Sequence, residues 1–174
     1  MRSLRSQIVP MSLGPDEAYP RLAHLHITYP EFAVWFWSKC APGVANGSRK
    51  IFTIWSDTDC GIVIAKKAPA ERKLCTVFVS KGFQNQGIGT RLMGLALTWL
   101  ECQRPVLTVP EEHLAQFEAM LIRIGFSLSH IVDSCYRPGA KEFIFNGHIF
   151  PDTKHHYSAM ARRNASLSPA VISL

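Results

Sequence analysis

One stretch of the sequence combines glycines, side-chain amides and a basic residue at a spacing suited to holding an anion. It is the segment 79–91, VSKGFQNQGIGTR. The residues before it predict a strand and those after it a helix, so the glycines precede a helix N-terminus, where free N–H groups and the helix dipole attract anions. Gly87 and Gly89 lack a Cβ and let a phosphate approach the backbone. The segment therefore predicts a phosphate site, with an ordinary strand-to-helix turn as the alternative.

The segment is neither a P-loop nor a dinucleotide-binding fingerprint, because the Gly-Lys-Ser/Thr ending and the third glycine are missing. It resembles the GNAT N-acetyltransferases, whose signature is Arg/Gln-x-x-Gly-x-Gly/Ala. Here the signature reads Gln84-x-x-Gly87-x-Gly89, and a Gly-Phe pair at Gly125 matches the end of the family's last helix. The order of strands and helices fits as well, so that the resemblance covers about residues 5–149.

The resemblance implies that acetyl-CoA is the cofactor and that this loop holds its pyrophosphate. It implies further that the pantetheine arm pairs like an extra strand with the strand before the loop, and that this strand and the strand near residues 106–109 splay apart around the thioester. A backbone N–H there would polarise the thioester carbonyl. The implied cofactor-binding residues are Phe78, Val79, Gln84, Asn85, Gln86, Gly87, Ile88, Gly89, Thr90 and Arg91.

The proton-transfer residues cannot be carried over from the family. Leu121 stands where the family often has a tyrosine acid, and Leu114 where it often has an asparagine. Chemistry then favours Tyr136 as the acid that protonates the leaving thiolate, with Thr76 holding a water and His113 as a further candidate. Packing or surface roles are the alternatives for each. Weaker candidates are Thr108, Cys75, His24, His26, Glu111, Glu112, Glu142 and Asn146.

The leading interpretation is an acetyl-CoA-dependent N-acetyltransferase in which a primary amine attacks the thioester directly. The acceptor classes left open are a small amine, a peptide amine and the amino acid of a charged tRNA. A non-catalytic acyl-CoA-binding or regulatory domain is the alternative raised by Leu121. A nucleic-acid-modifying enzyme is the alternative raised by the formal net charge of +6. A homodimer is also compatible with the sequence.

Composition sets the remaining bounds. The chain has 174 residues, 47% of them hydrophobic, which is enough for one domain with a sizeable core. No apolar run is long enough for a membrane helix, and the first residues do not read as a secretory signal. The five cysteines are widely spaced without a CxxC pair, which predicts no metal site and a reducing, cytoplasmic location.

The elements that must position the loop follow from hydrophobic periodicity. Together they predict an α/β (α+β) fold with a GNAT-like, mostly antiparallel mixed sheet of about seven strands and helices on both faces. Residues 1–149 form one acetyltransferase-like domain, and residues 150–174 a C-terminal basic tail. We expect Asp16 to cap the first helix and Tyr136 to lie on the penultimate strand, and we expect Ala41-Pro42-Gly43 to end the second helical region. The strands are expected at 7–12, 50–55, 61–65, 74–79, 106–109, 127–136 and 141–148, and the long helices at 88–102 and 111–124.

Overall fold

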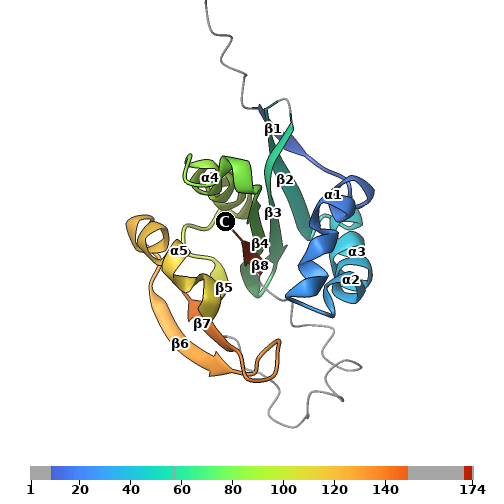
Figure 1. The fold of residues 1–174 in the computed structure, drawn as a ribbon. Coiled ribbons are helices and arrows are strands. Elements are labelled where there is room, and N and C mark those ends of the chain that lie inside the picture. Colours follow the sequence, from blue (N-terminus) through green and yellow to red (C-terminus); the bar gives the residue numbers. More distant parts are fainter. Residues whose placement is uncertain (1–8, 57, 149–170, 174) are drawn as a thin grey trace, which may run out of the picture.

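A mixed, mostly antiparallel sheet separates two layers of helices (Figure 1). The structure is a computed structural model and describes residues 9–56, 58–148 and 171–173. The strand order is β1-β2-β3-β4-β5-β7-β6, with β8 attached to β4. The prediction of about seven strands in a GNAT-like sheet with helices on both faces is confirmed.

The strands and helices follow one another along the chain in the predicted order. The strands are β1 (Val9–Ser12), β2 (Arg49–Ser56), β3 (Thr58–Ala68), β4 (Glu71–Val79), β5 (Val106–Pro110), β6 (Leu128–Asp133), β7 (Lys141–Phe145) and β8 (Val171–Ser173). The α-helices are α1 (Pro15–Leu22), α2 (Phe32–Trp35), α3 (Ala41–Ala45), α4 (Ile88–Leu100) and α5 (Glu111–Arg123). Shorter turns of helix are η1 (Ala23–Ile27), η2 (Phe36–Cys40) and η3 (Lys81–Phe83).

Helices α4 and α5 cover one face of the sheet and bury an apolar core against it (Figure 1). In α4 the buried residues Leu92, Ala96 and Leu100 recur at helical spacing, so a single stripe of the helix faces the strands. Helix α5 contributes Phe117 and Leu121, both fully buried. Leu121, which replaces the family's tyrosine, therefore points into this core.

The segment from α1 to α3 covers the opposite face and forms a second core with Ile62, Ile64 and Cys75. Its centre is aromatic: Phe32, Trp35 and Phe36 are buried, and their rings contact one another. Val34 and Trp37 remain exposed, so this helical segment is apolar all round but buries only one side.

Strands β4 and β5 separate shortly after they meet. They pair in parallel only at Lys73 with Val106 and Leu74 with Leu107. Beyond this point β5 pairs with β7, while residues Thr76–Phe78 of β4 pair in parallel with β8. Figure 1 shows β8 beside β4, on the side toward β5. Most of the segment predicted as a tail lies outside the described residues, and its described part is this strand.

Three local predictions are wrong. Gly14, not Asp16, is the N-cap of α1, because the Glu17 carboxylate accepts a bond of 3.0 Å from the Gly14 N–H and Asp16 falls in the first turn. Ala41-Pro42-Gly43 lies inside helix α3, since Pro42 occupies the first turn, where its missing N–H costs no hydrogen bond. Tyr136 lies in the turn between β6 and β7 rather than on a strand.

Candidate functional site

The loop between β4 and α4 has the backbone geometry that an anion site requires. Gly87 has a φ of +78°, which favours glycine, and nothing lies within 4 Å of the position its Cβ would occupy. Gly87 is the N-cap of α4, and no side chain caps this end of the helix. The first N–H groups of α4 therefore have no partner within the helix and remain available to a phosphate. The residues present fit the pyrophosphate of acetyl-CoA.

The glutamine side chains of the loop bind its own backbone. Gln84 Nε2 donates to the Val79 carbonyl at 3.3 Å, and Gln86 Nε2 donates to the Gly82 carbonyl at 2.9 Å. Asn85 adopts a positive φ of 60°. These contacts fix the shape of the loop, and a direct role for the three side chains at the phosphate stays a prediction.

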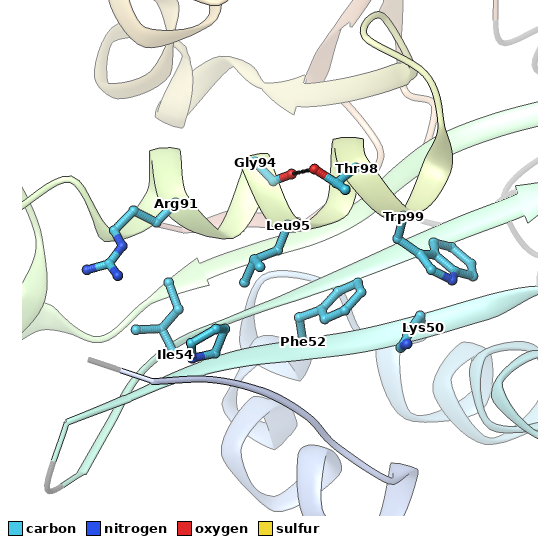
Figure 2. A pocket seen from close by; sticks show the side chains of 9 residues that line it. Lys50, Phe52, Ile54, Arg91, Gly94, Leu95, Thr98 and Trp99 are labelled. Atoms are coloured by element: carbon cyan, nitrogen blue, oxygen red, sulfur yellow. Dashed lines mark hydrogen bonds between the residues drawn. The ribbon is translucent and has the colours of Figure 1, made fainter. Parts of the chain in front are cut away.

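Arg91 lies on the first turns of α4 and lines a groove of about 570 Å³ between this helix and β2 (Figure 2). Leu95 and Trp99 continue the same side of the helix, opposite Ile54 and Phe52. The groove is mainly apolar. Arg91 therefore stands next to the loop, on the helix that the loop begins.

A polar cluster lies on the α1–α3 side of the sheet, near the point where β4 and β5 separate. We use this name for Tyr29, Lys73, Thr108, Tyr136, Arg137 and Glu142. Lys73 Nζ donates to the Tyr136 hydroxyl at 3.4 Å, and Thr108 lies beside that hydroxyl. The Arg137 guanidinium stacks 5.3 Å from the centre of the Tyr29 ring. Three strands and two turns thus bring distant parts of the chain together here.

Burial governs the protonation states of this cluster. It raises the pKa of Tyr136 well above the usual value, and the neighbouring Glu142 raises it further. Tyr136 is therefore protonated at neutral pH and is able to donate. Burial raises the pKa of Glu142 to about 8, against the opposing effect of the Arg137 cation. Lys73 is buried, and this desolvation lowers its pKa.

The other two predicted catalytic residues, Thr76 and His113, lie outside the polar cluster as defined above. Thr76 is fully buried on β4, and its hydroxyl has no hydrogen-bond partner within the described ranges. His113 lies in the first turn of α5, beside Glu112 and Arg137, and partial burial lowers its pKa. The structure thus places Tyr136 at the centre of the cluster and His113 next to its Arg137.

Several weaker candidates have structural partners. Asn146 joins two loops, because its side chain accepts from the Ser127 N–H at 3.0 Å and donates to the Pro105 carbonyl at 3.1 Å. Cys75 is buried and accepts a bond of 3.1 Å from Arg49. His24 lies closer to the expected cofactor site. The centre of its ring is 4.8 Å from that of Phe78, on the strand implied to hold the cofactor.

Sequence reasoning missed Lys73, Tyr29 and Arg137. Their burial follows from long-range packing, which local patterns do not encode. A lysine in an otherwise strand-like run, Lys73 before Leu74, was the one available signal.

The family model of the Acetyltransferase (GNAT) family matches residues 13–116, more than half of the chain. The chain belongs to the GNAT acetyltransferase family. It is therefore an acetyltransferase, and acetyl-CoA is its cofactor. A sequence comparison with curated proteins finds no match.

Several solved structures of GNAT acetyltransferases are similar to this chain over nearly their whole length. A GNAT-family protein from Desulfovibrio desulfuricans has a TM-score of 0.64 at 17% identity, covering 80% of this chain and 97% of that one. The Escherichia coli ribosomal-protein-S18-alanine N-acetyltransferase has a TM-score of 0.62 at 16% identity, with coverage of 84% and 98%. Arabidopsis thaliana NAA60 in complex with acetyl-CoA has a TM-score of 0.62 at 15% identity, covering 82% of this chain and 100% of that one. At these identities the likeness confirms the fold.

No helix within residues 9–56 or 58–148 has both the length and the apolar character to span a membrane. In the same ranges no group of histidine, cysteine and acidic residues is arranged to hold a metal ion. Two of the basic residues behind the nucleic-acid hypothesis are engaged in ion pairs, Lys66 with Glu71 and Lys67 with Glu101. A tRNA partner, a homodimer and a cytoplasmic location stay predictions.

Proposed function

We propose that this GNAT protein transfers the acetyl group of acetyl-CoA to the nitrogen of a primary amine. The observation that supports this most directly is the polar cluster where β4 and β5 separate. Its Lys73 lies near the start of β4, and the 84–90 loop follows the end of the same strand. Acetyl-CoA, when bound, supplies the activated acetyl group as a thioester. Two structurally similar proteins have names that specify N-acetylation, the ribosomal-protein-S18-alanine N-acetyltransferase and an aminoglycoside 6′-N-acetyltransferase.

The loop and strand β4 would hold the cofactor. The free N–H groups at the start of α4 would bind its pyrophosphate, and the backbone of Phe78 and Val79 would pair with its pantetheine arm. A backbone N–H of β4 would hydrogen-bond the carbonyl oxygen and stabilise the charge that develops on it. These roles require the edge of β4 beyond Leu74, where pairing with β5 ends and where β8 pairs in this structure.

Tyr136 would act as the general acid in place of the tyrosine that Leu121 replaces. Its hydroxyl is protonated at neutral pH and takes a hydrogen bond from Lys73, and this bond would stabilise the phenolate left after proton transfer. The thiolate needs only modest help, because a thiol with a pKa near 8.5 is a fairly good leaving group. The proton would thus move from the Tyr136 Oη to the sulfur as the C–S bond breaks.

The acceptor would enter on the α1–α3 side, where the cluster lies. Tyr29 and the aromatic residues of α2 border this side. An acceptor with an apolar portion beside its amine therefore suits the surroundings better than a highly charged polyamine. A small amine, a peptide amine and an aminoacyl-tRNA all satisfy this requirement.

Cofactor binding is tested by calorimetry on Gly87→Val. The left-handed backbone at Gly87 strains any residue with a Cβ, and the added side chain would crowd the phosphate, so acetyl-CoA binding should be lost. Gly47→Val is the matched control, since Gly47 has the same φ of +78° and the same open space but lies between α3 and β2, away from the loop; it should suffer the same strain and keep its affinity. Unchanged affinity in a folded Gly87→Val variant contradicts the loop assignment.

Acetyl transfer is tested by CoA-thiol release with a panel of amines, followed by mass spectrometry of the products. Amide products establish N-acetylation. Tight acetyl-CoA binding without release for any amine, peptide or charged tRNA identifies the non-catalytic alternative. Release that depends on tRNA, with binding weakened by salt, identifies the nucleic-acid alternative.

A further inference from the structure

Glu142 is a buried carboxyl group without a hydrogen-bond partner. Its side chain is fully buried on β7, and neither carboxyl oxygen has a partner within residues 9–56 or 58–148. Its backbone pairs with Pro110 at the end of β5. Unpaired buried carboxyl groups cost stability, so a functional reason for keeping one here is expected.

Charged and titratable groups face Glu142 from every neighbouring element. They are Arg137 and Tyr136 from the β6–β7 turn with Cys135 beside them, Glu112 from α5, Lys73 from β4 and Tyr29 from the turn before α2. Arg137 and Lys73 favour the carboxylate, whereas burial and Glu112 favour the acid. These opposing effects leave a pKa of about 8, close to the value a base needs in order to take a proton near neutral pH.

We propose that Glu142 is the general base that deprotonates the acceptor ammonium. This inference rests on the proposed N-acetyltransferase function. The Glu142 carboxylate takes one proton from the ammonium, and the free amine then attacks the thioester carbon as the C–S bond breaks. The nitrogen loses its second proton as the amide forms, and this proton restores Tyr136, which has protonated the CoA thiolate. The proton on Glu142 passes to solvent, so one proton is released per turnover.

The test compares Glu142→Gln with the wild type on two amines of different pKa. With an alkyl amine that is an ammonium at pH 7.5, kcat/KM should fall at least a hundredfold. With an amine whose conjugate acid has a pKa below 6, no base is needed, and the loss should be less than tenfold. Glu118→Gln, an equal change on the exposed side of α5, should leave both rates unchanged.

Different failures have different meanings. Equal losses on both amines, or no loss on either, overturn the role of Glu142 while N-acetylation stands. A wild type that acetylates no amine overturns both proposals. If Glu142→Gln does not fold, the wild-type pH profile decides: the rate with the alkyl amine should rise toward a pKa near 8, and the rate with the weakly basic amine should not.

A separate observation concerns β8. Its residues Val171–Ser173 pair in parallel with Thr76–Phe78, so β8 occupies the edge of β4 that the pantetheine arm requires. It lies between the diverging strands β4 and β5 and contacts both. One strand edge offers a single row of N–H and C=O groups, and two extended partners cannot use it together.

We infer that β8 is an autoinhibitory strand that acetyl-CoA must displace. This inference also rests on the proposed cofactor position. When only a fraction of molecules has the edge free, the apparent affinity falls by that fraction. If β8 is docked in 90–99% of molecules, removing it should tighten acetyl-CoA binding by roughly 10- to 100-fold.

The experiment measures acetyl-CoA affinity by calorimetry on the full chain, on a chain ending at residue 170 and on Ile172→Pro, whose proline disrupts the pairing. Both variants should bind more tightly than the full chain. A synthetic peptide of residues 165–174 should compete with acetyl-CoA on the shortened chain, whereas a scrambled peptide should not.

Equal affinity in all three chains overturns the inhibitory role and leaves the cofactor site intact. Absence of binding in all three overturns the cofactor position itself. If the shortened chain does not fold, hydrogen exchange on the full chain gives the answer. Acetyl-CoA should then increase exchange at Val171–Ser173 while the β4 amides stay protected, and unchanged exchange in β8 overturns the inference.

Discussion

The two faces of the sheet are built for different purposes. Under α4 and α5 the buried core is entirely apolar. On the α1–α3 side lie the buried charged residues of the described chain, Arg49, Lys73 and Glu142. The apolar face gains stability from burial, whereas the polar face gives up stability in order to hold the groups that we propose to move protons. The buried side chains with the strongly shifted pKa values, Tyr29, Tyr136 and Glu142, therefore gather on one face, and this asymmetry supports the proposed location of the chemistry.

The largest change in the free energy of unfolding is expected when a side chain of the apolar core is removed. Leu100→Ala removes a fully buried side chain at the end of α4 and should lower the free energy of unfolding by about 3–5 kcal/mol. Turnover per folded molecule should stay within about twofold, because Leu100 lies at the opposite end of α4 from the loop. Denaturant titration and active-site-normalised rates measure the two quantities. A large loss of turnover would mean that the two faces are not independent.

On the polar face, a substitution should increase stability instead of lowering it. The raised pKa of Glu142 means that the folded state holds its proton between pH 4.5 and about 8 while the unfolded state releases it. This contribution to stability is complete below pH 4.5 and is lost as the pH rises to about 8. Glu142→Gln cannot lose this contribution. Relative to the wild type, its free energy of unfolding should therefore rise by about 3 kcal/mol between pH 5 and pH 8.

Thermal unfolding of both proteins across this pH range checks the prediction. Parallel curves of melting temperature against pH would show that Glu142 titrates normally. A variant that is more stable at pH 8 and yet slower in turnover would show a residue kept for function at the expense of stability.

Tyr136→Phe should lower turnover by roughly a hundredfold, equivalent to about 2.7 kcal/mol in the barrier. The acceptor KM should change little, because the ring and its packing remain. Tyr19→Phe, on a ring that stacks with Phe36 and Trp37, is the matched control. Near-normal turnover in Tyr136→Phe would reduce Tyr136 to a packing residue and move the acid role to a water near Thr76 or Thr108, or to His113.

The smallest effect concerns α4 itself. Gly94→Ala replaces an exposed helical glycine that has open space around it and should raise the free energy of unfolding by about 0.5–1 kcal/mol. Acetyl-CoA affinity should not change. A shift in that affinity would connect the groove of Figure 2 with the cofactor.

The fold and the loop could be predicted because local patterns encode them. The helical spacing of Leu92, Ala96 and Leu100 and the glycines at Gly87 and Gly89 identify both from a few neighbouring residues. The family resemblance further predicted that β4 and β5 diverge. The strand pairing confirms this, because the two strands pair at only two positions.

The polar cluster could not be predicted in the same way, because its members come together only through packing between distant segments. Lys73 and Tyr136 are 63 residues apart, and their contact depends on where the β6–β7 turn falls. Gly43 is a second residue whose role depends on distant packing. The local sequence Ala41-Pro42-Gly43 predicts the end of a helix, but the segment lies inside α3. A Cβ there would lie 2.6 Å from the Arg49 side chain, so this glycine makes room for packing inside a helix.

The early divergence of β4 and β5 gives this sheet an edge inside the molecule. Outer edge strands such as β1 and β6 face any neighbour in solution, and exposed apolar residues on them, Met11 and Ile131 among others, favour nonspecific association. The inner edge lies between two strands of the same sheet, and in this structure β8 pairs with it. Because it offers one row of N–H and C=O groups, it can bind one extended chain at a time, so any ligand that pairs there competes with the protein's own strand.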